Sequence, residues 1–422
     1  MTRQSPAISV AKPRVYFVNR YFYPDESATS QLLSDLAFGL AQGGNEVHVL
    51  CSRQLYGSPR ARLCAEETIR GVVVHRVWTT RFGRRRLLGR ALDYGSYYLT
   101  CAAALLLQLR RNDIVVAKTD PPLISIVAWA AARARDAVLI NWLQDVFPEI
   151  ASRLGVNPLP AVLDRQVQRL RDGSLRAAAC NVVLGDRMRD YLSGRPAAAE
   201  KFRVIENWAD GEGAPPKRSA DSDLRAGLNL GGKFIVGYSG NLGRVHEYQT
   251  VLGAAEALRA DDQIAFLFIG GGVKMDELMA LTAQRGLKNF HFLPYQVRDC
   301  VADSLAAADV HLVSLLPALE GLIVPSKFYG ILAAGRPVVF VGDPQGELAP
   351  IIREANCGRI VAAGDSAGLA RTIRALQSDA RTCEAMSAAA HELFCSRFSA
   401  RRALASWTAL LDEIHAARPN RQ

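Results

Sequence analysis

A lysine in the second half of the sequence stands where a phosphorylated ligand could bind. In residues 324–327, Pro325 suits the first turn of a helix, so Ser326 and Lys327 would lie beside unpaired backbone N–H groups. The helix dipole disfavours a lysine at that position unless an anion lies between. We therefore predict a diphosphate at Ser326 and Lys327; the alternative is a solvated surface lysine.

A glycine-rich turn upstream could approach the same phosphates. It follows an apolar run, and its small residues are Gly240, Asn241 and Gly243. Glycines let the backbone come close to a phosphate, and Arg244 would add a charged fork. A second glycine run, centred on Gly271, follows another apolar run and would add a close approach on the same sheet edge. An ordinary tight turn is the alternative for both.

Three acidic residues could contact hydroxyl groups. Glu320, followed by Gly321, stands in an apolar loop, where a carboxylate costs free energy unless it is hydrogen-bonded. Its carboxylate could accept hydrogen bonds from two hydroxyl groups of a sugar; the alternative is a carboxylate on the loop surface. Asp145 and Glu149 follow a predicted strand and would project from its carboxyl end. They could orient an acceptor hydroxyl or act as a base, with a helix cap as the alternative.

The stretch 76–111 combines positive charge with apolar side chains. One acid, Asp93, stands against its arginines, which are Arg76, Arg81, Arg84, Arg85, Arg86, Arg90, Arg110 and Arg111. Leucines and tyrosines lie between them: Leu87, Leu88, Leu92, Tyr94, Tyr97, Tyr98 and Leu99. Such a segment suits an anionic membrane surface. The alternative is a solvated basic face over a packed helix.

Two α/β units must position these residues. Apolar runs predict strands at 14–19, 47–51, 72–78, 113–118, 137–142, 180–184 and 202–206, and then at 234–238, 265–269, 290–293, 310–315, 337–341 and 359–361. Helical patterns alternate with them, which indicates two doubly wound parallel sheets. We predict domains at 1–208 and 225–395, a linker at 209–224, and a helix at 396–422 that packs on the first domain. Because ligands bind at the carboxyl ends of such strands, the site should lie between the domains.

Composition narrows the class of protein. The 422 residues carry a net charge of +10, which suggests an anionic partner. The eight cysteines form no Cys-x-x-Cys pair, which favours free thiols in a reducing compartment. The start resembles no secretory signal, and the longest apolar stretch, 97–109, is short of the ~20 residues of a membrane span. Asp221 and Asp223 follow no strand, so we predict no metal site there. No Gly-x-Gly-x-x-Gly follows the first strand, which argues against a dehydrogenase.

Together these residues resemble the family 4 retaining glycosyltransferases of the GT-B type. The resemblance is greatest to the bacterial branch that builds O-antigen, capsule and colanic-acid-like polysaccharides. It covers nearly the whole chain, and its most specific pieces are residues 21–24 (YFYP), 144–149 (QDVFPE), 237–243 (GYSGNLG) and 324–338 (VPSKFYGILAAGRPV). It implies two Rossmann-like domains, with the sugar nucleotide held mainly by the second.

The resemblance also implies roles for individual residues. Glu320 would be the first glutamate of the family's Glu-x7-Glu motif and contact the donor sugar, while Lys327 and Arg244 would bind the diphosphate. The second glutamate falls on Gly330, so ribose recognition must come from elsewhere, and we assign it to Glu347. Many relatives have a histidine where this chain has Gln144, which is compatible with a 6-deoxy donor. Acceptor-side residues would be Tyr23, Gln144 and Glu149.

We therefore predict a retaining, metal-independent enzyme without a cofactor. It would move a hexosyl or 6-deoxyhexosyl residue, N-acetylated or not, from a UDP- or GDP-sugar to a polyprenyl-diphosphate-linked acceptor. Its catalytic residues would be Lys327, Arg244, Glu320 and Asp145, and a donor phosphate oxygen would deprotonate the acceptor. We expect a cytoplasmic protein bound peripherally to the inner face of the cell membrane. The rivals are a sugar-nucleotide 2-epimerase on the same fold and a non-enzymatic nucleic-acid binder, although no nucleic-acid motif is visible.

Overall fold

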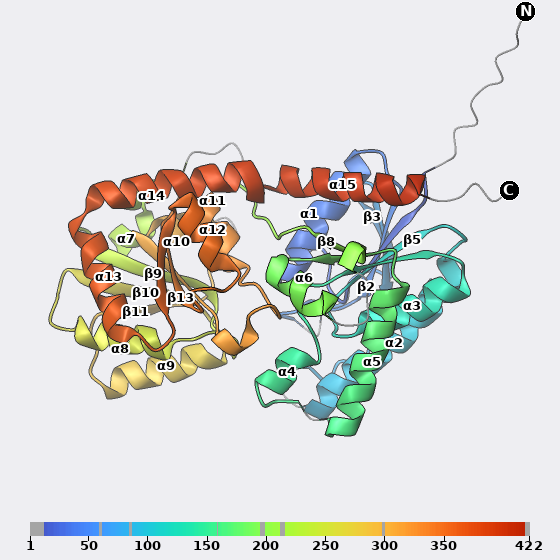
Figure 1. Cartoon of the computed structure of the whole chain (residues 1–422), viewed down its shortest axis with the longest axis horizontal. Coiled ribbons are helices and arrows are strands. Elements are labelled where there is room, and N and C mark those ends of the chain that lie inside the picture. Colours follow the sequence, from blue (N-terminus) through green and yellow to red (C-terminus); the bar gives the residue numbers. More distant parts are fainter. Residues whose placement is uncertain are drawn as a thin grey trace, which may run out of the picture.

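The computed structural model describes residues 12–58, 61–83, 87–157, 159–194, 199–211, 216–297 and 300–417. Four parts of the sequence-based predictions lie outside these ranges: the polar N-terminal segment up to residue 11, Arg84 to Arg86 of the basic stretch, residues 212–215 of the linker, and residues 418–422 of the predicted C-terminal helix. Figure 1 shows two α/β domains side by side, with the last two long helices running along one edge of both.

The first domain contains an eight-stranded sheet in the order β3-β4-β2-β1-β5-β6-β7-β8. Its strands are β1 (Val15–Val18), β2 (Val47–Ser52), β3 (Glu66–Ile69), β4 (Val72–Val77), β5 (Ile114–Lys118), β6 (Val138–Trp142), β7 (Cys180–Val183) and β8 (Phe202–Val204). All neighbours pair in parallel except β3, which pairs antiparallel with β4. Every residue of β1, β2 and β5 is buried, as expected for a sheet covered on both faces.

The second domain repeats this architecture with a six-stranded parallel sheet in the order β11-β10-β9-β12-β13-β14. Its strands are β9 (Phe234–Asn241), β10 (Ile264–Gly271), β11 (Phe290–Leu293), β12 (Val310–Ser314), β13 (Val338–Gly342) and β14 (Gly358–Ala362). In both sheets the strand order reverses beside the first strand of the domain. Such a switch point places loops at the carboxyl ends of neighbouring strands, where a ligand can be held.

Helices cover both sheets. Those of the first domain are α1 (Ala28–Gln42), α2 (Leu87–Gln108), α3 (Ile124–Ala134), α4 (Glu149–Arg153), α5 (Ala161–Ala177) and α6 (Asp186–Ser193). Those that follow are α7 (Asp223–Gly227), α8 (Gln249–Ala257), α9 (Val273–Gln284), α10 (Val301–Ala306), α11 (Lys327–Ala333), α12 (Leu348–Ala355), α13 (Ser366–Ser378), α14 (Ala380–Leu393) and α15 (Ala400–Ala416). Among the helices of the described ranges, none is both long and apolar enough to cross a bilayer.

The last helix, α15, returns to the first domain. Trp407 is fully buried there, with its ring centroid 4.9 Å from that of Trp142 and 6.5 Å from that of Phe17. Leu404 lies against Gly39 of α1, where any larger residue would collide with it. The chain therefore crosses between the domains twice, once after β8 and once before α15 (Figure 1).

The two domains also touch through the loops at their carboxyl edges. The backbone N–H of Val146 donates to the carbonyl of Leu322 at 2.9 Å, and Asp145 pairs with Ile323 as an isolated antiparallel bridge. Val146 and Leu322 belong to one apolar cluster that spans both domains. Both segments that meet at this contact carry predicted site residues, Asp145 in the first domain and Glu320 in the second.

Candidate active site

Lys327 lies at the centre of the carboxyl edge of the second sheet. It is the first residue of α11, with Ser326 as N-cap. Its Nζ lies 2.8 Å from the hydroxyl of Tyr238 and 3.1 Å from Nε2 of His246. Its Cε is 3.8 Å from the position that a Cβ would take at Gly240. The predicted lysine and the predicted glycine turn are therefore neighbours in space.

His246 fixes the direction of this amine, and sequence reasoning missed it. Its Nδ1 lies 2.7 Å from the carbonyl oxygen of Ser314, which can only accept a hydrogen bond. Nδ1 must then carry the proton, so Nε2 is left to accept from Lys327. Burial, together with the positive charge of Lys327, lowers the pKa of His246 to about 3. The ring therefore stays neutral at physiological pH.

Lys327 has no carboxylate partner within the described residues. Burial alone lowers the pKa of its amine to about 7. Two other lysines do have carboxylate partners: Lys217 lies 2.6 Å from Asp303, and Lys274 lies 2.7 Å from Glu277. A partly buried ammonium group whose partners are two neutral groups is energetically unfavourable unless a bound anion compensates its charge.

Glycines at the ends of β9 and β10 keep the space beside Lys327 open. Gly240 has φ of +117° and Gly270 has φ of +134°, a region that side-chain-bearing residues rarely adopt. A Cβ at Gly270 would overlap the carbonyl of Gly240. Gly271 lies against Tyr295, and Asn241 is exposed.

Two further residues predicted to meet the donor are open to solvent. Arg244 and Ser326 are both exposed, and Arg244 forms no hydrogen bond or ion pair with any described residue. Gly243 lies one residue before Arg244 and is partly exposed. These groups are free to contact a ligand that rests on Lys327.

Glu320 and Glu347 are linked to each other. Oε2 of Glu320 accepts the backbone N–H of Glu347 at 3.0 Å, whereas its Oε1 is buried without a hydrogen-bond partner. Burial raises the pKa of Glu320 to about 7. Gly321, which follows it, has φ of +75°. An unsatisfied buried carboxylate oxygen is costly, so this group is suited to accept a ligand hydroxyl.

Glu347 differs from the sequence-based expectation that it meets a ribose. Its two carboxylate oxygens accept the backbone N–H groups of Asp186 (3.1 Å) and Arg187 (2.7 Å). These are the first residues of α6 in the other domain, where unpaired N–H groups attract a carboxylate. In this arrangement, Glu347 is an interdomain helix cap.

On the first domain, Asp145 lies near a buried lysine that the sequence reading did not single out. Burial raises the pKa of Asp145 to about 7; Asp120 raises it further and Lys118 opposes this. The amine of Lys118 donates to the carbonyl of Thr29 at 3.0 Å and lies 3.6 Å from the ring centroid of Trp142. Burial lowers the pKa of Lys118.

The remaining acceptor-side candidates are occupied by protein partners. The side-chain amides of Gln144 and Asn207 exchange two hydrogen bonds, at 3.0 and 2.9 Å. Glu149 forms a buried ion pair with Arg171 at 2.6 Å. The Tyr23 ring packs edge-on against Phe38. The structure thus gives all three a packing or pairing role; for Glu149 this is an ion pair and not the helix cap considered as the alternative.

Only part of the basic stretch 76–111 is exposed on the surface. Arg76 is buried, where it pairs with Glu67 and donates to the carbonyl of Tyr23, and Tyr97 is buried in the core. In contrast, Arg90, Arg110 and Arg111 are exposed at the two ends of α2. Exposed leucines of that helix include Leu88, Leu92, Leu99, Leu106 and Leu107.

Comparison with known protein families identifies the family to which this chain belongs. Residues 29–208 match the model described as a glycosyl transferase 4-like domain, and residues 233–379 match that of glycosyl transferases group 1. The chain belongs to the family 4 glycosyltransferases. Both domains match, so the expected fold, two facing Rossmann-like domains of the GT-B type, is confirmed.

Individual relatives agree with this assignment. The glycosyltransferase is 29% identical over 296 residues to the probable glycosyltransferase WbjE of Pseudomonas aeruginosa, covering 69% of this chain and 73% of that protein. It is 28% identical over 271 residues to the putative colanic acid biosynthesis glycosyl transferase WcaI of Escherichia coli, covering 63% and 66%. Anabaena HepE, solved with UDP and glucose, shares its fold at a TM-score of 0.71 and 16% identity, over 95% of this chain and all of that one.

Proposed function

We propose that this glycosyltransferase moves a hexosyl or 6-deoxyhexosyl residue from a UDP- or GDP-sugar to a polyprenyl-diphosphate-linked acceptor in cell-surface polysaccharide synthesis. One observation carries the donor part: Lys327 is a partly buried cation with no carboxylate partner among the described residues, beside glycines that leave the backbone open. A diphosphate supplies the missing charge. HepE, with the same fold, was solved with UDP, and the name of WcaI refers to colanic acid synthesis, which supports the substrate classes.

Lys327 would stabilise the leaving group. Two of its three protons are directed to Tyr238 and His246, which leaves the third for a phosphate oxygen. As the bond between the sugar's anomeric carbon and the diphosphate oxygen breaks, negative charge grows on that oxygen. A preorganised cation there lowers the barrier more than a mobile one would. Arg244, which is exposed and lies three residues after the end of β9, would add a second cation.

The acceptor would attack from the same side, which gives retention of configuration. Its hydroxyl forms the new bond to the anomeric carbon, and its proton passes to the departing phosphate oxygen, so neither a protein nucleophile nor a metal is needed. Glu320 would accept a donor-sugar hydroxyl through its unpaired Oε1. Asp145 would orient the acceptor hydroxyl, since it lies at the interdomain contact. Closure of the domains would exclude water that could hydrolyse the donor.

The first domain would meet the membrane surface through α2. Its exposed leucines include Leu88, Leu92, Leu99 and Leu106, which follow one another at helical spacings of 4, 7 and 7 residues and so share a face. Arg90 and Arg111 lie exposed near its ends. An apolar stripe flanked by arginines suits an anionic lipid surface, where a lipid-linked acceptor resides.

Nucleotide-dependent thermal stability tests the donor assignment. We expect UDP or GDP, and the matching sugar nucleotide, to raise the melting temperature, because a ligand that binds only the folded state stabilises it. AMP serves as a control that lacks the diphosphate. Donor incubated without acceptor should be recovered unchanged, whereas an epimerase would alter its sugar. Absence of any shift with every nucleoside diphosphate would contradict the proposal.

The sugar preference is a separate proposal with its own assay. The Gln144 side chain is buried and its amide is paired with that of Asn207, so less of its hydrogen-bonding capacity remains for the donor sugar. We therefore expect 6-deoxy donors to be turned over faster than their 6-hydroxy counterparts in parallel reactions. Equal turnover of both would remove this preference and leave the diphosphate site intact.

A further inference from the structure

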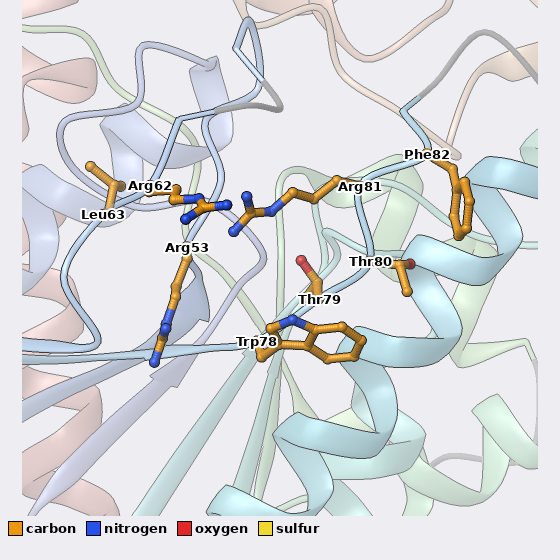
Figure 2. A pocket seen from close by; sticks show the side chains of 8 residues that line it. All are labelled: Arg53, Arg62, Leu63, Trp78, Thr79, Thr80, Arg81 and Phe82. Carbon is orange, nitrogen blue, oxygen red and sulfur yellow. The ribbon is translucent and has the colours of Figure 1, made fainter.

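The first domain contains an open pocket that the donor site does not use (Figure 2). Its volume is about 560 Å³. The residues that line it follow the carboxyl ends of β2 and β4 or precede β3: Arg53, Arg62, Leu63, Trp78, Thr79, Thr80, Arg81 and Phe82. The pocket therefore opens at the same edge of the sheet as Asp145, which follows β6.

Its arginines carry charge that the protein does not neutralise. Arg62 and Arg81 are exposed and form no ion pair with any described residue. In Figure 2 their guanidinium groups point toward each other across the pocket. Arg53 also lines the pocket, but its guanidinium points away from Arg62 and Arg81, and its Nε donates to the carbonyl of Arg76 at 3.2 Å. Like charges that face one another repel, and an anion between them removes that cost.

A buried hydroxyl points into the same space. Thr79 is only 3% exposed, and its Oγ1 has no hydrogen-bond partner. Figure 2 shows this oxygen directed toward the side of the pocket where Arg62 and Arg81 meet. A buried hydroxyl without a partner costs free energy, and an anion oxygen at this position would accept its hydrogen bond.

The loop that carries Arg81 is held in place without a ligand. Asp93 of α2 accepts hydrogen bonds from Thr80 Oγ1 (2.7 Å) and from the backbone N–H groups of Phe82 and Gly83 (3.0 Å each). Gln54 donates to the carbonyl of Thr80 at 2.6 Å. The one acid of the basic stretch thus supports the loop and does not neutralise the pocket. A site that is already ordered loses little entropy on binding.

Apolar surface adjoins the cations. Trp78 and Phe82 are 56% and 65% exposed, although aromatic side chains of this size are usually covered. Thr100 of α2 donates to the carbonyl of Trp78 at 2.9 Å, so the pocket wall rests on the helix that carries the exposed leucine stripe. A ligand that combines an anionic head with an apolar chain would match both surfaces.

We infer that this pocket binds the diphosphate of the lipid-linked acceptor, with Arg62, Arg81 and Thr79 on the phosphates and Trp78 and Phe82 on the first isoprene units. The inference rests on the proposed function. Strands in a sheet are about 4.8 Å apart, so β2 and β4 lie roughly 14 and 19 Å from β6. That span exceeds one sugar ring. The acceptor must therefore already carry sugars between its diphosphate and the reacting hydroxyl, placed there by a sugar-1-phosphate transferase and a preceding glycosyltransferase.

Binding of farnesyl diphosphate tests the pocket directly. The measurement is made with saturating UDP or GDP, whichever stabilises the protein, so that the donor site is filled. We expect Arg62→Gln/Arg81→Gln to weaken farnesyl diphosphate binding at least about tenfold, since charge-assisted hydrogen bonds are lost. Arg133→Gln, an exposed arginine near the end of α3 in the same domain, is the matched control and should bind normally. Thr79→Val should weaken binding less, by severalfold.

The outcomes separate the possible sources of the anion. Inorganic pyrophosphate that binds as tightly as farnesyl diphosphate would overturn the lipid assignment. Equal loss of binding to phosphatidylglycerol vesicles without any diphosphate would overturn the diphosphate assignment in favour of a general lipid surface. Unchanged farnesyl diphosphate binding by the double variant, with a normal nucleotide-induced thermal shift, refutes this inference alone. Failure of the wild-type protein to bind any nucleotide would instead refute the proposed function.

Discussion

Replacing Lys327 by methionine should keep or raise the stability of the ligand-free protein and, at the same time, strongly reduce turnover. The pKa of the amine is lowered to about 7 by burial, so the charged form costs on the order of 3 kcal/mol once solvent access to the side chain is allowed for. Methionine has a similar length and no charge. We therefore expect the ligand-free variant to be at least as stable as the wild-type protein.

The same substitution should reduce turnover by ~10²–10³-fold, the usual loss when one preorganised donor to a developing negative charge is removed. Turnover is measured by release of nucleoside diphosphate with the lipid-linked acceptor, and stability by urea unfolding. Lys233→Met is the control, since Lys233 lies at the opposite end of β9 and donates only to the carbonyl of Asp262. It should keep both turnover and the nucleotide-induced thermal shift.

The pH dependence of the free energy of unfolding provides a second test of this argument. Because the folded-state pKa of Lys327 lies below its unfolded value, the folded chain binds fewer protons between pH 7 and the ordinary lysine range. This group therefore makes wild-type stability rise with pH in that window, and Lys327→Met should lose that rise. Near-normal turnover in Lys327→Met, or a variant much less stable than the wild type, would show that the amine is structural and refute the argument.

Three further outcomes follow from contacts in the structure. His246→Phe should lower kcat about tenfold with little change in KM and shift the pH profile, because Lys327 loses an acceptor that orients it; an unchanged pH profile would mean that His246 only fills space. Nucleotide binding at pH 8 should take up protons, measured by calorimetry in buffers of different ionisation enthalpy, since a bound diphosphate raises the pKa of Lys327; the affinity should then fall as pH rises above about 7. Trp407→Ala should destabilise the first domain by about 3–5 kcal/mol in urea unfolding, because it leaves a cavity against Trp142; a loss below about 1 kcal/mol would contradict the packing of α15.

The sheets could be predicted from the sequence because their strands are continuous apolar runs. Each of the predicted strands coincides with an observed one to within a few residues. The strand that was missed, β3, has the sequence Glu66-Glu67-Thr68-Ile69 and an alternating exposed and partly buried pattern. It is a short edge strand, held by pairing with β4, and pattern alone does not distinguish it from a polar loop.

The site could be predicted only where its residues are close in sequence or carry a strong local signal. The position of Lys327 at the start of a helix was visible in residues 324–327. His246 was missed because its two partners lie 68 and 81 residues away, and a single histidine after a glycine turn has no local signature. For the same reason, the partners that occupy Gln144 and Glu347 could not be anticipated, since they are 63 and about 160 residues distant.

The two crossings of the chain between the domains are themselves joined. The backbone N–H of Ala209, on the first crossing, donates to the carbonyl of Phe398 on the second at 3.2 Å, and Glu206 and Arg397 form an ion pair across them at 2.7 Å. These two hydrogen-bonded and ion-paired segments together form the covalent connection between the domains. Two joined crossings would favour rotation of the domains about an axis near this pair and would restrict twisting and sliding more than a single tether does. Lys327 and Asp145 would consequently approach and separate along one arc, which would keep the proposed donor and acceptor aligned through each reaction.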